Sequence, residues 1–218
     1  MPIICLAGAL LNIVINILST VPGGKFPLYS DTILTVTLTF IGGPFWGALC
    51  GALTNLIGHS IRFWGWAGYL FALCNIATAL LTYLFIRLFP RELALSKWWK
   101  AGRFDIPGER ASKSRRLESI MGRIVVLVLL SFALCLAMSI LGGLIAAFIQ
   151  FLNPAPPDPI HISAFLAPIL FGQHVPIVVV EILSRIPVNI IDRLIAAFGG
   201  YGIALALMPL KRIFPHNS

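Results

Sequence analysis

The run Ile124–Ile149, with the sequence IVVLVLLSFALCLAMSILGGLIAAFI, contains no charged side chain. A helix needs about 20 predominantly apolar residues to cross the hydrocarbon core of a bilayer, and this run is longer. The whole chain shares this character: 58% of its 218 residues are hydrophobic and 11% are charged, whereas about 25% are charged in a soluble domain. These values exclude an ordinary soluble enzyme, a disordered chain and a secreted disulfide scaffold. They predict an all-α integral membrane protein.

Further apolar segments complete a predicted bundle of six transmembrane helices, formed by residues 1–218 as a single domain. The segments are Ile3–Leu18, Thr32–Ile41, Phe45–Ile57, Gly65–Ile86 and about Ile186–Leu207. We expect the first to be a transmembrane helix rather than a cleaved signal peptide, because it lacks a basic start and an A-x-A-like cleavage site. Gly42-Gly43-Pro44 separates the second segment from the third, since glycine and proline interrupt helices.

One apolar stretch leaves the number of spans open. Ala164–Val180 carries no charge, but prolines and the pair Gln173-His174 interrupt it. It is either a seventh span or part of an outer segment of about residues 151–183. We favour the outer segment, because the proline ring breaks the hydrogen-bond ladder of a helix.

Basic residues gather between the fourth and fifth predicted spans. They are Arg87, Arg91, Lys97, Lys100, Arg103, Arg110, Lys113, Arg115, Arg116 and Arg123. Cytoplasmic loops of membrane proteins carry an excess of Lys and Arg. We therefore predict a cytoplasmic loop at about residues 87–123 and both termini in the cytoplasm. The formal net charge of +8 then comes mainly from the loop that orients the chain in the lipid bilayer. We therefore expect no nucleic-acid partner.

Signatures of common enzyme classes are absent from the sequence. It contains no GxxxxGKS or GxxxxGKT phosphate loop, no HExxH metal motif and no GxSxG nucleophile motif. The four cysteines lie singly in apolar runs, which is typical of small buried side chains rather than of a metal site. We expect a protein that is not an enzyme and that needs no metal or cofactor.

Polar residues inside the predicted spans concentrate in their outer halves. Such residues are costly in lipid and normally face a partner or a water-filled cavity, so we predict a binding cavity that opens to the outside. The candidate ligand-binding residues are Asn16, Asn55, His59, Trp64, Trp66, Asn75, Asn189, Asp192 and Arg193. The amides would form hydrogen bonds, the tryptophans would stack on a ring, and the charged pair would meet charged groups of the ligand.

Each of these assignments has a structural alternative. The amides of Asn55 and Asn75 could serve only to join neighbouring helices. Asp192 and Arg193 could form a structural pair, and the aromatic residues near Trp64 could form an interfacial belt. Gly47 and Gly51, on the same helix face as Asn55, are explained by close helix packing alone.

Four features in this order resemble the substrate-binding S-components of energy-coupling factor (ECF) transporters, which import vitamins and micronutrients into bacteria. The first is the outer loop ending in FPLYSD at Phe26–Asp31. The second is GGPFWGALCGALTN at Gly42–Asn55, similar to the family pattern GP-x-x-G-x-x-x-G-x-x-x-N. The third is the long basic loop, and the fourth is IPVNIIDR at Ile186–Arg193, similar to the P-x-N segment that opens the family's last helix.

The resemblance implies a six-helix bundle in the bacterial cell membrane that captures a small, vitamin-like solute at its outer face. It also implies a transmembrane coupling subunit and two cytoplasmic ATPase subunits as partners. Family members contact the coupling subunit through an Ala-x-x-x-Ala face on the first helix. Here Ala7, Gly8 and Ala9 are the candidates, although Leu11 follows Ala7 at the family spacing. The alternative function is a ligand-sensing membrane module that signals to a cytoplasmic partner.

Overall fold

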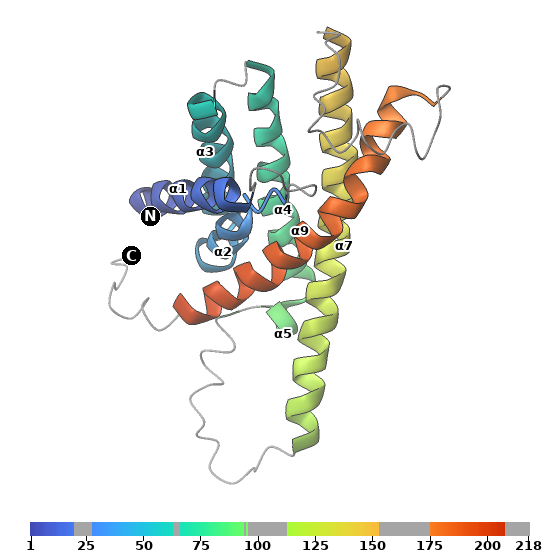
Figure 1. Cartoon of the computed structure of the whole chain (residues 1–218). Coiled ribbons are helices and arrows are strands. Elements are labelled where there is room, and N and C mark those ends of the chain that lie inside the picture. The colour runs from blue at the N-terminus through green and yellow to red at the C-terminus, as the bar shows by residue number, and fades with distance from the viewer. Residues whose placement is uncertain (20–27, 63–65, 94, 96–112, 153–174, 208–218) are drawn as a thin grey trace.

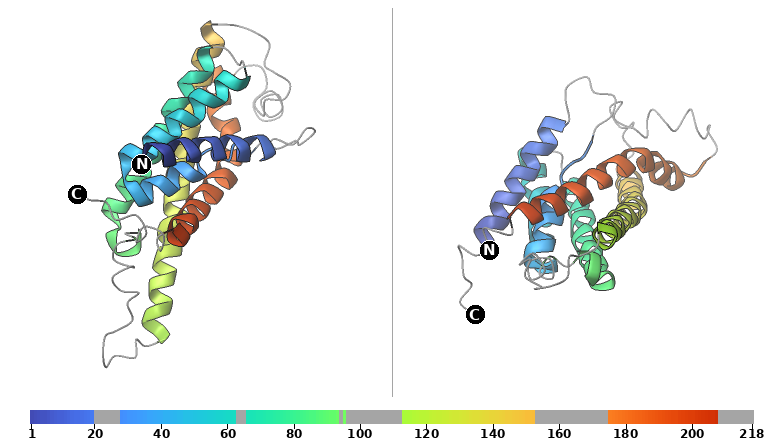
Figure 2. Two further views of the ribbon diagram at one scale, coloured as in Figure 1. Left: turned by 90° about the vertical axis from the view of Figure 1, so that its left-hand side faces the viewer. Right: turned by 90° about the horizontal axis from the view of Figure 1, so that it is seen from below.

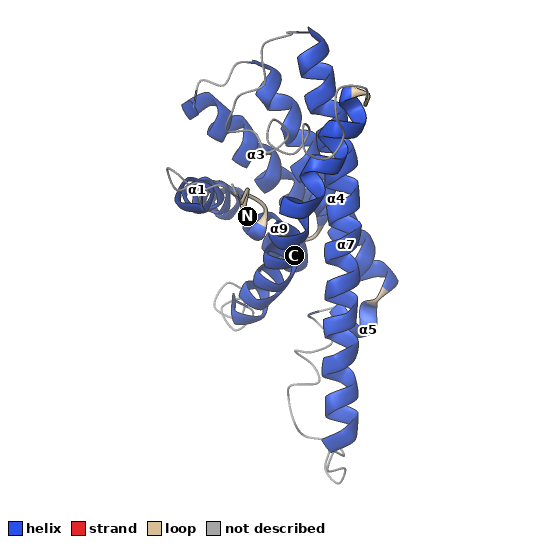
Figure 3. Cartoon of the chain, turned by 45° about the vertical axis from the view of Figure 1, so that its right-hand side comes forward, coloured by secondary structure: helices blue, strands red, loops and turns tan. Residues whose placement is uncertain are grey.

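The computed structural model describes residues 1–19, 28–62, 66–93, 95, 113–152 and 175–207. All regular structure in these residues is helical, as Figures 1 and 3 show. The helices are α1 (Pro2–Ser19), α2 (Ile33–Gly42), α3 (Pro44–Arg62), the 3-10 helix η1 (Trp66–Phe71), α4 (Ala72–Leu88), α5 (Pro90–Leu93), α7 (Lys113–Leu152) and α9 (Ile177–Leu207). The prediction of an all-helical protein is confirmed.

Four helical stretches are long and apolar enough to cross a membrane. They are Pro2–Ser19, Ala67–Leu88, Glu118–Leu152 and Ile177–Leu207. The 10 residues of α2 rise about 15 Å, half of the roughly 30 Å hydrocarbon core. The 19 residues of α3 include polar side chains that lower its hydropathy. The described residues thus form a multi-pass helical bundle.

The two longest helices form its frame. α7 and α9 pack along each other and run in opposite directions, as Figure 1 shows. α3 packs against α4, and α1 lies across the bundle, nearly perpendicular to α7 in Figure 1 and in the left view of Figure 2. α2 lies in the interior, because it contacts α1, α3, α4 and α9. This position explains why most of its residues are buried.

Glycines set the close contacts of α3, as the sequence predicts. Gly43, between α2 and α3, adopts a φ of 92°, which glycine reaches without steric cost. A Cβ atom at Gly51 would lie 2.9 Å from the Asn75 Cβ and 3.0 Å from the Asn75 carbonyl oxygen. Gly51 therefore allows α3 and α4 to approach closely at the level of Asn75.

The segment before the last predicted span differs from the expectation. α9 begins at Ile177 rather than near residue 186, and it includes Pro187. Residues 177–183, predicted as part of an outer segment, are its first two turns. Pro187 has no amide hydrogen to donate to the carbonyl of Leu183 one turn earlier, and proline is tolerated inside membrane helices because surrounding groups satisfy such freed carbonyls. Residues 153–174 lie outside the described residues. They include most of Ala164–Val180, the stretch that could be a seventh span.

Candidate functional site

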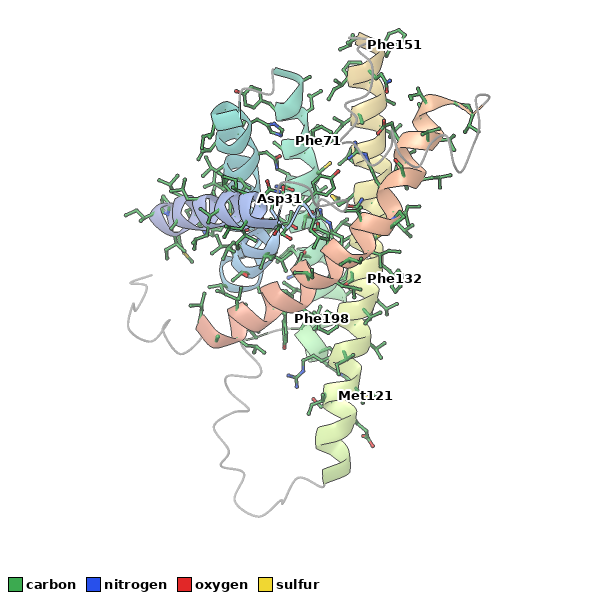
Figure 4. All side chains as sticks on the ribbon, in the orientation of Figure 1. Asp31, Phe71, Met121, Phe132, Phe151 and Phe198 are labelled. Carbon is green, nitrogen blue, oxygen red and sulfur yellow. The ribbon has the colours of Figure 1, made fainter. Side chains whose placement is uncertain are left out.

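Charged and polar side chains meet in the interior of the bundle, where the segment before α2 contacts α4 and α9. Figure 4 shows Asp31 there, at a level between Phe71 and Phe198. We call this group the central cluster. Its members are Tyr29, Ser30, Asp31, Thr32, Asn75, Glu181, Arg185, Asp192 and Arg193.

Asp192 and Arg193 of α9 hold the segment before α2. The Asp192 side chain is fully buried, and its Oδ1 accepts a hydrogen bond from the Ser30 amide at 2.6 Å. Its Oδ2 forms an ion pair with an Arg193 guanidinium nitrogen at 2.9 Å. Arg193 also donates to the Thr32 hydroxyl at 2.8 Å. Ser30 has a φ of 40°, a conformation that residues with side chains rarely adopt, so these bonds fix a strained segment.

Asp31 faces α4. The Asn75 amide donates to its Oδ2 at 3.0 Å, and the same nitrogen lies 3.5 Å from the Gly51 carbonyl oxygen. Asn75 is buried, whereas Asp31 is partly exposed. The predicted ligand-binding residues Asn75, Asp192 and Arg193 are therefore brought together around a residue, Asp31, that the sequence marked only as the start of a span.

A second ion pair lies two to three turns earlier in α9. The Glu181 Oε2 is 3.4 Å from an Arg185 guanidinium nitrogen, and both side chains are buried. The Arg185 guanidinium carbon lies 5.5 Å from the centre of the Phe71 ring, a cation–π contact. The Tyr29 hydroxyl interacts electrostatically with Arg185, Glu181 and Asp31. Both ion pairs therefore belong to one cluster.

Asn189 lies between Arg185 and Asp192 in α9, so its position shows how far the central cluster lies from the basic segment. Its amide donates to the Ser139 hydroxyl of α7 at 2.9 Å, so it joins two helices. Ser139 follows Arg123, the last basic residue of the predicted cytoplasmic loop, by 16 residues (139 − 123), which is about 24 Å along a helix. The hydrocarbon core is about 30 Å thick. The cluster therefore lies in the half of the bundle away from the basic segment.

The asparagines of α1 hold other segments in place. Asn12 is buried, donates to the hydroxyls of Thr35 at 3.4 Å and Thr54 at 3.3 Å, and accepts the Leu34 amide at 3.0 Å. The predicted ligand-binding residue Asn16 donates to the Tyr29 carbonyl oxygen. Both residues therefore link α1 to the segment that carries Asp31 or to the helix that follows it.

Asn55 and His59 continue the face of α3 that Gly51 begins. Asn55 has 8% of its surface exposed, and its Nδ2 has no hydrogen-bond partner among the described residues. The ring of His59 is stacked 6.5 Å from that of Phe71 and lies edge-on 6.2 Å from that of Tyr69. Trp64 lies outside the described residues. Trp66 begins η1, but its side chain is also outside them.

The three residues predicted to contact a coupling subunit do not share one face. Ala7 is exposed, whereas Gly8 and Ala9 are buried. A Cβ atom at Gly8 would lie 3.2 Å from both the Cys50 Sγ and a Leu38 methyl carbon. Gly8 and Ala9 therefore pack against α2 and α3, and of the three only Ala7 lies on the outer surface of α1.

Sequence reasoning missed six members of the cluster as site residues: Tyr29, Ser30, Asp31, Thr32, Glu181 and Arg185. Glu181 and Arg185 show the (i, i+4) spacing of a helical ion pair, which was a usable signal. Tyr29 had no such signal, because only the path of the chain brings its hydroxyl beside α9.

No protein-family model, curated protein or solved structure matches this chain. Its class therefore rests on the fold and the site: a multi-pass helical membrane protein with a buried cluster of carboxylate, guanidinium and amide groups. These groups accept and donate hydrogen bonds and carry both charges.

Proposed function

We propose that this chain is the substrate-specific binding subunit of an ATP-driven, ECF-type vitamin or micronutrient importer in a bacterial cell membrane. The observation that carries the proposal is the central cluster, since ionisable groups within an apolar bundle are by default candidates for a functional site. The cluster is assembled from segments far apart in the sequence. Its position away from the basic segment suits capture of a solute from the outer face.

Buried donors without partners support solute binding. The Nε atoms of Arg185 and Arg193 and the Nδ2 of Asn55 are buried and make no hydrogen bond within the described part of the chain. A buried donor left without an acceptor costs about 1–3 kcal/mol. A solute that supplies acceptors to these atoms would recover this free energy, so the interior favours a bound polar molecule.

In this proposal the bundle spans the membrane six times, with both termini and the loop at about 87–123 in the cytoplasm. A transmembrane coupling subunit and two cytoplasmic ATPase subunits supply the energy for transport. The chain itself captures the solute, and its sequence contains no phosphate loop that would hydrolyse ATP. α2 and α3 make up the two further predicted spans beside the four long apolar stretches, and the 10 residues of α2 cover about half of the hydrocarbon core.

The test is purification of the tagged chain in mild detergent from the cells that encode it, followed by mass spectrometry of proteins and small molecules that remain bound. We expect two ATPases, one further membrane subunit and a retained solute. Recovery of a histidine kinase in place of the ATPases would support the sensor alternative. A preparation with neither ATPases nor a solute would contradict the proposal.

A further inference from the structure

The charges of α9 in the central cluster balance within that helix. Glu181 pairs with Arg185, and Asp192 pairs with Arg193. All four residues have 5% or less of their surface exposed. Two acids and two arginines give this part of α9 a net charge of zero.

Asp31 is the unbalanced charge. It accepts a hydrogen bond from Asn75, but in the part of the chain that the structure describes it forms no ion pair. Arg193 interacts with it electrostatically, yet this guanidinium already pairs with Asp192. With Asp31, the cluster contains three acids and two arginines, a net charge of −1 (2 − 3).

A carboxylate in an apolar interior is costly unless a positive group pairs with it. Asp31 is also the one charged member of the cluster that is partly exposed, so a solute can reach it. We propose that Asp31 is the counter-ion of a positively charged group on the solute. On this inference, which rests on the proposed function, the substrate class is an organic cation with a protonated amine or a quaternary nitrogen.

Asn55 supplies a second contact of the same site. It lies one helical turn after Gly51 on the face of α3 that packs against α4, and Gly51 contacts Asn75, the partner of Asp31. Its buried Nδ2 has no hydrogen-bond partner in the part of the chain that the structure describes. The solute therefore carries a hydrogen-bond acceptor near its cationic group, which distinguishes it from a simple alkylammonium ion.

An organic cation fits the site better than a metal ion. Metal sites in proteins gather several carboxylate, imidazole or thiolate ligands. No group of three or more His, Cys, Asp or Glu side chains is suitably placed among the described residues. A single carboxylate instead suits the N–H donors of a protonated amine, and the amide donors beside it suit an acceptor group of the solute.

The test uses the full-length protein in detergent and its thermal unfolding with matched compounds. The probes are indole, pyridine and imidazole rings, each carrying an aminoethyl, a hydroxyethyl or a carboxyethyl group. We expect aminoethyl compounds alone to raise the unfolding temperature. Asp31→Asn should weaken their binding by roughly 10- to 100-fold, the value of a charge-assisted hydrogen bond. Asp31→Glu should keep the preference for the amine.

Glu118→Gln is the control, because it removes one negative charge from an exposed residue of α7 far from the cluster. It should leave binding of the aminoethyl compounds unchanged. Equal or greater stabilisation by hydroxyethyl or carboxyethyl compounds would overturn the inference, and so would the lack of any shift with the whole panel. Recovery of ATPases with the chain does not depend on probe charge, so the inference can fail while the proposed function stands.

Discussion

The bond between Asp192 and the Ser30 amide allows a direct test of the central cluster. Asp192→Ala removes the acceptor of a 2.6 Å hydrogen bond between segments 162 residues apart. Hydrogen bonds to charged groups contribute about 1.5–3 kcal/mol, although bonds between membrane helices average about 0.6 kcal/mol with a maximum of about 1.7. The substitution also leaves Arg193 buried without its counter-ion. We expect a loss of about 2–3 kcal/mol in the free energy of unfolding.

Asp192→Asn separates the hydrogen bond to Ser30 from the charge. It keeps an oxygen that can accept the Ser30 amide hydrogen, but the oxygen that faces Arg193 becomes an amide nitrogen, which is a donor. It should cost less than Asp192→Ala, because it keeps a neutral hydrogen bond, which is roughly half as strong as a charge-assisted one.

The assay is reversible unfolding in mixed micelles by increasing the fraction of SDS, followed by circular dichroism and tryptophan fluorescence. Asn189→Ala is the comparison, because it removes one bond between neutral groups, to Ser139, and should cost about 0.6 kcal/mol. A cost for Asp192→Ala no larger than that of Asn189→Ala would refute the assignment of Asp192 as the residue that holds the segment before α2.

Three further predictions follow from the same contacts. Asp31→Asn should leave the solute-free protein as stable as the wild type or up to about 1 kcal/mol more stable, because it removes an uncompensated carboxylate; a clear loss in the same SDS titration would contradict this. Gly51→Ala should cost about 1–3 kcal/mol, since its Cβ would lie 2.9 Å from that of Asn75. Its control Gly202→Ala, with nothing within 4 Å, should stabilise α9 by about 0.5–1 kcal/mol, and equal effects of the two would refute the close α3–α4 contact. Glu118→Cys should react with a membrane-impermeant maleimide only in inside-out vesicles, and labelling in intact cells would reverse the proposed orientation.

The sequence was sufficient to predict an all-helical membrane protein and the approximate place of its main helices, because the apolar runs are separated by polar or helix-breaking residues. Gly42-Gly43-Pro44 marked the boundary between α2 and α3, and Gly51 marked a close contact. The start of α9 was misjudged, because Pro187 and the polar residues before it look like the end of a loop. Neighbouring helices, which a local pattern does not show, are what allow the helix to continue through Pro187.

Membership of the central cluster was predicted in part. Asn75, Asp192 and Arg193 stood out because polar groups are rare in apolar runs. Sequence alone could not separate them from Asn189, which bonds to Ser139 of α7. Nor could it show that Gly8 faces inward, because the rotation of a helix about its axis is set by packing against its neighbours.

The distribution of charge within the cluster follows from how a membrane helix is built. Charged residues enter the bilayer at lower cost when an opposite charge on the same helix accompanies them, and α9 carries both of its pairs in this way. These four charges are therefore already paired within α9 before the helices assemble. In the assembled bundle, Asp192 and Arg193 hold the segment before α2 in place. Asp31 precedes a short helix that carries no charge, so its compensation must come from outside its own helix. Asn75 supplies one hydrogen bond, and under the proposed function a cationic solute would supply the missing charge, so Asp31 would then be the member of the cluster that sets the selectivity of binding.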